Sequence, residues 1–175
     1  DDKEAVSPVA DGTWTDPASG LTWQVSPTGG TMTWDDAKSH CLELDLAGGG
    51  WHLPTIGELR TLIRGCPGTE TSGDCNVSDA CLDNTDCWDV NACWNCADHC
   101  GQDTNGMYWP DEVRGDCCSF WSLSPSEDVA EGAWYVDFGT GNLCDADVRA
   151  DMLARCVRVD DSSASEDIWI DSASW

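Results

Sequence analysis

The sequence is poor in basic residues, and this shortage excludes several classes of partner. Only 8 of its 175 residues are lysine or arginine, against 33 aspartates and glutamates, which gives a formal net charge of −25. Nucleic acids are bound through clustered Lys and Arg side chains, so the composition excludes a nucleic-acid partner. The same charge disfavours anionic lipid surfaces. It also makes the compact state repel itself, an effect that cross-links or bound cations would offset.

Long apolar runs and histidines are also scarce. The chain contains no apolar run of about 18 residues, so it predicts no membrane-spanning helix. The three histidines, His40, His52 and His99, do not combine with a serine or cysteine in a recognisable nucleophile motif. We therefore expect a binding protein and not an enzyme.

Cysteine, in contrast, is abundant, with twelve residues in the chain. Cysteines at this density indicate disulfides in an oxidising compartment, because a reducing cytosol keeps thiols free. The sequence thus predicts an exported protein, either secreted or held at the cell surface. Most of the cysteines lie in one stretch: Cys66, Cys75, Cys81, Cys87, Cys93, Cys96, Cys100, Cys117 and Cys118. We expect Cys144 to bond back to this stretch.

Composition divides the chain into three parts. Residues 1–11 are polar and aperiodic, which is typical of a leader or linker. Residues 12–160 carry the patterns of a single domain, interrupted at 66–118 by an insert rich in Cys and Asp. Residues 161–175 form a tail whose apolar end, Ile168 to Trp175, is expected to dock on its own domain or on a neighbouring molecule.

Two helices and several short strands are predicted around the segment 51–59. Thr55 and Glu58 form a capping box, which predicts a helix that continues to Ile63. Thr33 caps an earlier helix that buries Cys41. Strands are predicted at 13–15, 21–25, 119–122, 133–138, 143–147 and 155–159. These elements describe an α+β domain with an antiparallel sheet.

Five sequence blocks, taken in order, resemble one known family. The blocks are Gly20-Leu21-Thr22-Trp23-Gln24, Trp51-His52-Leu53-Pro54-Thr55-Ile56-Gly57-Glu58-Leu59, Phe120-Trp121-Ser122, Ala133-Trp134-Tyr135-Val136-Asp137-Phe138 and Arg155-Cys156-Val157-Arg158. In this order, from Gly12 to Val159, they are similar to a bacterial family typified by the C-terminal domain of the collagen-like adhesin Lcl, with Fibrobacter-type major paralogous relatives. The chain departs from the family at His52, where arginine is usual, and at Leu123, where serine or threonine is usual.

The resemblance implies a C-type-lectin-like fold, in which two helices pack on a small antiparallel sheet and a long loop carries ligand contacts. The insert at 66–118 corresponds to that loop. The resemblance also implies a disulfide between Cys41 and Cys156, which joins the first helix to the last strand. It indicates an adhesion or recognition module that binds an extracellular glycan or protein. The alternative is a structural subunit of a filament or surface assembly that uses residues 162–175 for contacts.

Aromatic residues of the insert are the candidates for ligand binding. Trp88, Trp94, Tyr108 and Trp109 lie where an apolar interior is scarce. Flat amphipathic rings of this kind contact sugars and protein partners. The alternative is that these rings pack on the disulfides.

Asp- and Asn-rich loops are candidates for a structural calcium ion, because calcium prefers carboxylate and carbonyl oxygens. The predicted ligands are Asp83 and Asp86 in one loop, and Asp103 and Asn105 in another. Neither loop is a complete EF-hand, because each lacks the downstream glutamate.

A second metal motif is present in the insert. Cys93, Cys96, His99 and Cys100 have a spacing that is typical of zinc ligands. The neighbouring cysteines favour disulfides at these positions instead.

Overall fold

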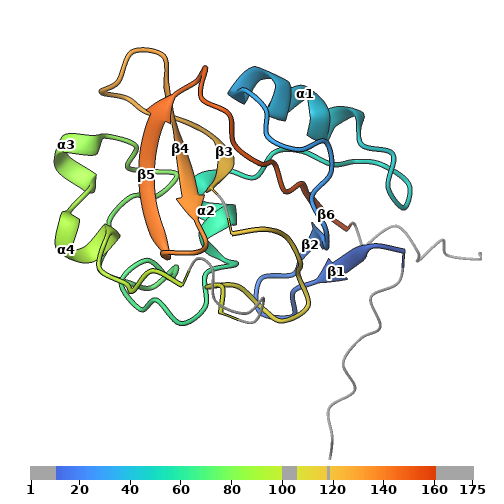
Figure 1. Ribbon diagram of the computed structural model, residues 1–175, viewed down its shortest axis with the longest axis horizontal. Coiled ribbons are helices and arrows are strands. Elements are labelled where there is room, and N and C mark those ends of the chain that lie inside the picture. The colour runs from blue at the N-terminus through green and yellow to red at the C-terminus, as the bar shows by residue number, and fades with distance from the viewer. Residues whose placement is uncertain (1–10, 100–105, 118, 161–175) are drawn as a thin grey trace, which may run out of the picture.

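Two small antiparallel sheets form the frame of the domain. The computed structural model describes residues 11–99, 106–117 and 119–160 (Figure 1). One sheet has the order β1-β2-β6, with bounds Thr13–Thr15, Leu21–Gln24 and Val157–Val159. The other has the order β3-β4-β5, with bounds Ser119–Pro125, Gly132–Asp137 and Asn142–Asp147. The α+β class is therefore as predicted, but the strands form two sheets and not one.

Four helices accompany the sheets in the described part of the chain. Their bounds are Trp34–Glu43 for α1, Ile56–Arg60 for α2, Asn84–Cys87 for α3 and Val90–Cys93 for α4. The first two are the predicted helices, although α2 ends at Arg60 and not at Ile63. The other two lie in the insert, where the sequence predicted no regular structure.

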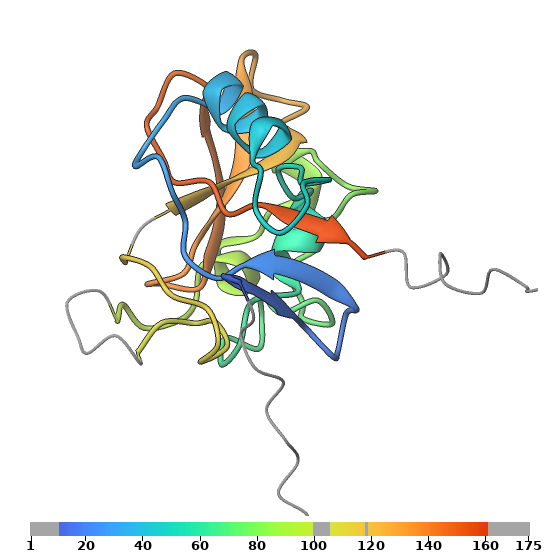
Figure 2. The ribbon, with the colours of Figure 1, turned by 90° about the vertical axis from the view of Figure 1, so that its right-hand side faces the viewer.

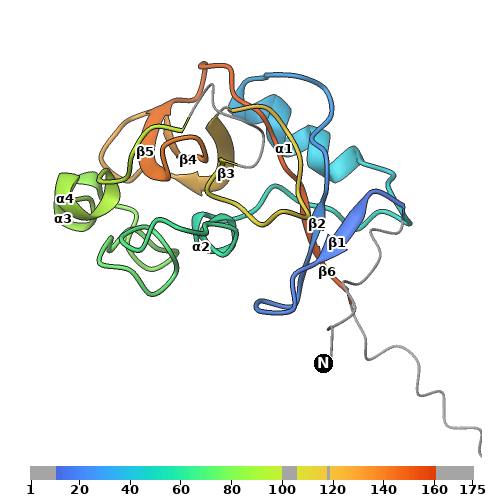
Figure 3. The ribbon, with the colours of Figure 1, turned by 60° about the horizontal axis from the view of Figure 1, so that its bottom comes forward.

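The helices occupy different sides of the sheets. α2 packs against β3 and β4, and α1 contacts β3. α3 and α4 lie outside β5, at the far end of the molecule from β1 and β6 (Figures 1 and 3). Because β2 pairs with both β1 and β6, the first and last described strands share one sheet (Figure 2).

Two buried tryptophans connect the core to neighbouring loops through hydrogen bonds. Trp121 and Trp134 are fully buried, and their indole nitrogens donate to the carbonyls of Met32 (3.0 Å) and Leu82 (3.0 Å). Each indole therefore fills the core and satisfies a loop carbonyl at the same time. The buried residues fall into two clusters, a larger one around α2 and a smaller one that contains Ala37, Cys41, Trp51, Leu53, Trp121, Ala133, Ala154 and Cys156.

The smaller cluster contains the disulfide that the family resemblance implied. Cys41 of α1 is joined to Cys156, which directly precedes β6, across a sequence separation of 115 residues. Both cysteines are fully buried. The bond therefore connects the first helix to the last strand of the described domain.

Arg155, beside that disulfide, is buried without a carboxylate partner. Its Nη1 donates to the carbonyls of Gln24 (2.8 Å) and Val25 (2.6 Å), and its Nη2 donates to that of Arg114 (2.6 Å). Burial lowers the pKa of Arg155 to about 9, which leaves the guanidinium charged at neutral pH. One side chain thus joins the end of β2 to the segment that leads into β3.

The start of α2 has the capping box that the sequence predicted. The Glu58 amide donates to Thr55 Oγ1 (3.1 Å), and the Thr55 amide donates to Glu58 Oε2 (2.9 Å). His52 Nε2 lies 3.0 Å from the same Glu58 oxygen. At the position where the family usually has arginine, His52 therefore adds a titratable partner to the cap.

This pair predicts a pH-dependent contribution to stability. The hydrogen bond to Glu58 raises the pKa of His52 above 6.5. Burial acts to raise the pKa of Glu58, but hydrogen bonds from His52 and the Thr55 amide outweigh it and lower that pKa below 4.5. The His52 contribution is complete below pH 6.5 and is lost as pH rises through its folded pKa. The Glu58 contribution is complete above pH 4.5 and is lost on acidification.

We therefore expect His52→Gln to destabilise the protein most between pH 4.5 and 6.5. The loss should stay below about 1 kcal/mol, because both side chains are partly exposed to solvent. Urea unfolding from about pH 4 to about pH 9 measures the difference. His40→Gln is the control, since His40 contacts the Thr28 hydroxyl and not a carboxylate. A difference that does not vary with pH would contradict the role of the pair.

Candidate functional site

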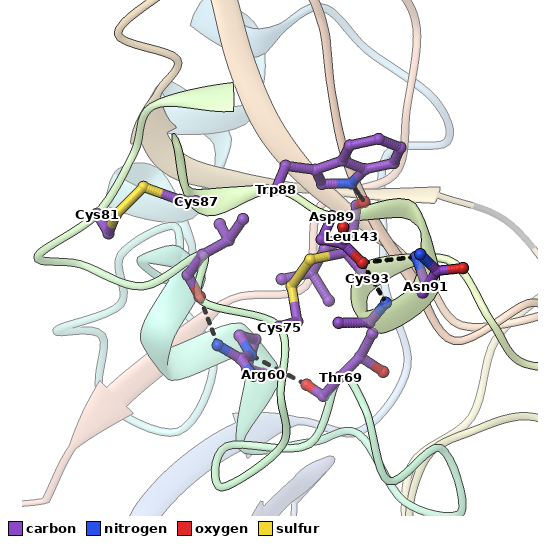
Figure 4. The surroundings of a disulfide bond; sticks show 12 residues. Arg60, Thr69, Cys75, Cys81, Cys87, Trp88, Asp89, Asn91, Cys93 and Leu143 are labelled. Carbon is purple, nitrogen blue, oxygen red and sulfur yellow. Dashed lines mark hydrogen bonds between the residues drawn. A yellow bond between two sulfur atoms is a disulfide. The ribbon is translucent and has the colours of Figure 1, made fainter. Parts of the chain in front are cut away.

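Three nested disulfides shape the insert. Cys66–Cys96, Cys75–Cys93 and Cys81–Cys87 have sequence separations of 30, 18 and 6 residues, and each bond encloses the next. The chain therefore folds back on itself, with α3 and α4 on the returning arm. Figure 4 shows the two inner disulfides of the series.

The outgoing arm is held by a buried arginine of α2. Arg60 Nε donates to the Thr69 carbonyl (2.9 Å), Nη2 to the Glu70 carbonyl (2.7 Å), and Nη1 to the Val77 carbonyl. Figure 4 shows Arg60 reaching from α2 into this arm. The guanidinium supplies donors to a loop whose carbonyls have no strand partner, which fixes the path of residues 69–77.

The returning arm covers the outer edge of β5. Asp83 and Asp89 cap α3 and α4 by accepting hydrogen bonds from the backbone amides of the first turn. Trp88 Nε1 donates to the Leu143 carbonyl (2.7 Å) of β5 (Figure 4), and Asn84 Nδ2 donates to Asp145 Oδ1 (2.7 Å). The insert is thus docked on the scaffold through a strand edge that would otherwise be open.

Trp94, which follows α4, is the large aromatic residue that the insert exposes. Its side chain is 52% exposed and meets Trp88 edge to face, with ring centroids 6.5 Å apart. With the Asn142 amide oriented to donate to the Thr140 carbonyl, the Asn142 oxygen accepts from Trp94 Nε1 at 3.0 Å. Trp94 is therefore fixed in orientation although half of its surface faces solvent.

A small pocket lies beside this ring. Its volume is about 80 Å³, and its lining consists of Trp94, Tyr135, Asp137, Thr140, Asn142 and Cys144. The Tyr135 ring and several hydrogen-bonding groups from the β4–β5 hairpin thus converge next to the exposed indole. This combination suits a ligand with an apolar face and polar edges. The sequence identified Trp94 but gave no signal for the hairpin residues, which become neighbours only through docking of the insert.

Tyr108 and Trp109 do not belong to this surface, and the prediction that they bind a ligand was wrong. They are only 6% and 7% exposed. Trp109 packs against Phe120 and Phe138, with centroid distances of 5.9 and 5.4 Å. The Tyr108 hydroxyl donates to the Ala97 carbonyl (2.8 Å). This later part of the insert therefore returns to the core, which the apolar run from Met107 to Trp109 could have indicated.

The calcium prediction is not settled by the described residues. Asp83 Oδ1 accepts from the amides of Thr85 (2.6 Å) and Asp86 (2.9 Å), so this loop uses one carboxylate as a helix cap. Within residues 11–99, 106–117 and 119–160, no three His, Cys, Asp or Glu side chains are grouped as metal ligands. Asp103 and Asn105 lie outside the described residues.

One prediction about the cysteines is confirmed and another is wrong. Cys93 and Cys96 form disulfides, as the neighbouring cysteines favoured, and are not zinc ligands. Cys144 does not bond back to the insert and is a free thiol. Burial raises the pKa of this thiol, and Tyr135 is its hydrogen-bond partner.

The fold and the docked insert define a disulfide-rich α+β domain with an exposed, cross-linked loop, of the kind found in extracellular proteins. The Lcl C-terminal domain family matches residues 12–158, and the chain belongs to this family. A comparison with curated proteins found no match. Among the helices of the described segments, none has the length and apolar character needed to cross a membrane.

Proposed function

We propose that this chain is an exported cell-surface recognition module of the adhesin type, which binds an extracellular glycan through the insert face around Trp94. The observation that carries the proposal is the combination of exposure and fixation at Trp94. Half of the indole faces solvent, while its edge is held by Trp88 and by Asn142. A fixed aromatic face binds a sugar ring at a low entropic cost, because little side-chain freedom remains to be lost.

We also propose that the fold is C-type-lectin-like, as the family resemblance implied. Three features support this proposal. The first and last described strands share a sheet, and Cys41 is bonded to Cys156. The insert between α2 and β3 is long and cross-linked, which suits a ligand-binding loop.

The proposed role is binding and not catalysis. The Cys144 thiol has a pKa raised by burial, which reduces the thiolate needed for nucleophilic chemistry. His52 is engaged with Glu58, and His99 Nδ1 lies 2.7 Å from the Gly106 carbonyl. These contacts give neither histidine the arrangement of a general base beside a nucleophile.

Trp94→Ala is expected to reduce binding on a glycan array by about tenfold, because stacked aromatic contacts each contribute roughly 1–1.5 kcal/mol. Binding of the wild-type protein and the variant to the same immobilised polysaccharides measures the loss. Leu42→Ala is the matched control, since Leu42 is 72% exposed and belongs to α1, which lies far from α3 and α4 in Figure 1. Both substitutions remove an exposed apolar side chain, but only the first should affect binding. Equal binding by Trp94→Ala and wild type would reject this face as the site.

A further inference from the structure

A second, larger depression lies between the two arms of the insert. Its volume is about 700 Å³, and its polar lining consists of Asp74, Asn76, Asp89, Asn91 and Asn95. Asp74 and Asn76 belong to the outgoing arm, whereas the other three belong to the returning arm around α4. Trp94 and its pocket involve a separate set of lining residues. We refer to the larger depression as the polar cleft.

The walls of the polar cleft are covalently fixed. Cys75–Cys93 and Cys66–Cys96 each join the outgoing arm to the returning arm. At the base, a Cβ on Gly68 would come within 2.6 Å of the Ala92 carbonyl, so only glycine permits the two arms to approach this closely. Arg60 holds the outgoing arm from behind through the Thr69 and Glu70 carbonyls. The cleft is therefore preformed, which lowers the cost of binding.

The lining has a specific chemical character. Each arm contributes one carboxylate and at least one side-chain amide to the polar cleft. Amides both donate and accept hydrogen bonds, as hydroxyl groups do, and carboxylates accept from ammonium groups. The apolar part of the lining is limited to small side chains such as Pro67 and Ala92. The cleft thus lacks the deep apolar surface that would anchor a large hydrophobic side chain.

The charge of the whole chain restricts the ligand further. Among the residues that the structure describes, no lysine or arginine lines the polar cleft. Elsewhere, Arg60 and Arg155 are buried, while Arg149 and Arg158 pair with carboxylates. A net charge of −25 therefore acts on the cleft, and Arg60, the basic side chain behind its wall, is buried against backbone carbonyls. Sulfated or carboxylated polymers are repelled from such a surface, and cationic ones are attracted.

We infer that the polar cleft binds an amine-bearing glycan, with the ammonium groups of an amino-sugar polymer among Asp74 and Asp89 and its hydroxyls on the asparagine amides. The inference rests on the proposed function and adds a second binding surface and a ligand class to it. A neutral sugar can hydrogen-bond to the asparagine amides but has no ammonium group to pair with the aspartates, so it binds more weakly. Anionic sugars are excluded by charge.

Isothermal titration of the oxidised, full chain tests this assignment with three hexamers: β-1,4-linked glucosamine, its N-acetylated form, and lysine. The glucosamine hexamer should bind about tenfold more tightly than the N-acetylated one, since N-acetylation removes the ammonium groups that form two partly exposed ion pairs. Asp74→Asn with Asp89→Asn should abolish this preference, and asparagine at 89 still caps α4. Asn91→Ala with Asn95→Ala should weaken binding of both sugars. Added salt should reduce the preference for the glucosamine hexamer without weakening the binding of the N-acetylated hexamer.

The control has the same net charge as the Asp74→Asn, Asp89→Asn variant, but its two changes lie at the end of α1 and just after it. Glu43→Gln with Asp45→Asn should leave the preference intact, because these exposed residues lie outside the cleft. If hexalysine bound more tightly than the glucosamine hexamer, and Asn91→Ala with Asn95→Ala did not weaken its binding, the ligand would be a basic peptide and the assignment would be overturned. Unchanged titrations for both cleft variants would also overturn it. Trp94 does not line the cleft, so the array experiment with Trp94→Ala tests the proposed function separately. If the titrations overturn the assignment of the cleft, the proposed function still stands.

Discussion

Replacing Cys41 and Cys156 together with alanine is expected to lower the free energy of unfolding by about 5 kcal/mol. The bond closes a loop across 115 residues, and the chain entropy released in the unfolded state grows with the length of that loop. Both sulfurs are fully buried, so the double variant also leaves unfilled space in the smaller core cluster. Urea unfolding under oxidising conditions measures the change in midpoint and slope.

Removal of Cys81–Cys87 provides the comparison for loop length. Its separation is 6 residues, for which the same entropy relation gives about 2 kcal/mol. Both double alanine variants lose one disulfide and gain no free thiol. If the two variants are equally destabilised, loop length does not account for the stabilisation by the long-range bond.

The scaffold was predictable because its signals are local. Thr55 and Glu58 are three residues apart, and their mutual hydrogen bonds are those of a capping box. The β1–β2 hairpin follows from the short turn between two alternating segments. The end of α2 was less predictable, since the apolar spacing continues to Ile63 although helical geometry stops at Arg60. There the chain turns so that the Arg64 amide can donate to the Tyr108 carbonyl, a contact distant in sequence.

The insert was not predictable, because long-range bonds determine its path. α3 and α4 are each four residues long, too short to show an apolar period, and only the capping aspartates Asp83 and Asp89 mark them. The pairing of the cysteines decides which side chains face each other, and cysteine positions alone do not give that pairing. Trp109 was therefore placed with Trp94 in the prediction, although one packs in the core and the other faces solvent.

The same reasoning applies to the candidate site. Trp94 could be chosen from the sequence as an aromatic residue in a region poor in apolar partners. Tyr135 and Asn142 could not, since they lie on a hairpin that follows the insert in the chain. They reach Trp94 because Trp88 docks on Leu143, which is a contact between residues 55 positions apart.

Arg155 shows how a charge can stabilise this domain without an ion pair. Its guanidinium bonds to three carbonyls and lies 5.1 Å from the ring centroids of both Trp109 and Phe120. Backbone carbonyls and aromatic faces are both attractive to a cation. The residue therefore joins β2, the end of the insert and the aromatic core at one point.

Arg155→Met is expected to destabilise the protein by about 3 kcal/mol. Methionine fills much of the same space but donates no hydrogen bond, so the Gln24 and Arg114 carbonyls lose their guanidinium donors, at roughly 1–3 kcal/mol for each unsatisfied group. The Val25 carbonyl keeps the Arg114 amide as a donor (2.8 Å). Removing the buried charge also removes its desolvation cost, and this offsets part of the decrease in the free energy of unfolding. Urea unfolding gives the free-energy difference.

Arg149→Met is the matched control for this prediction. Arg149 is also an arginine with several hydrogen bonds, but its side chain is 71% exposed and pairs with Glu131 and Asp147 at the surface. Its loss should cost much less than the loss of Arg155, because a solvent-exposed ion pair contributes little to stability. Arg155→Lys should fall between the two, because an ammonium keeps the charge but lacks the planar fork that reaches carbonyls on separate segments. If Arg155→Met were as stable as Arg149→Met, the carbonyl contacts would contribute nothing beyond those of a surface ion pair.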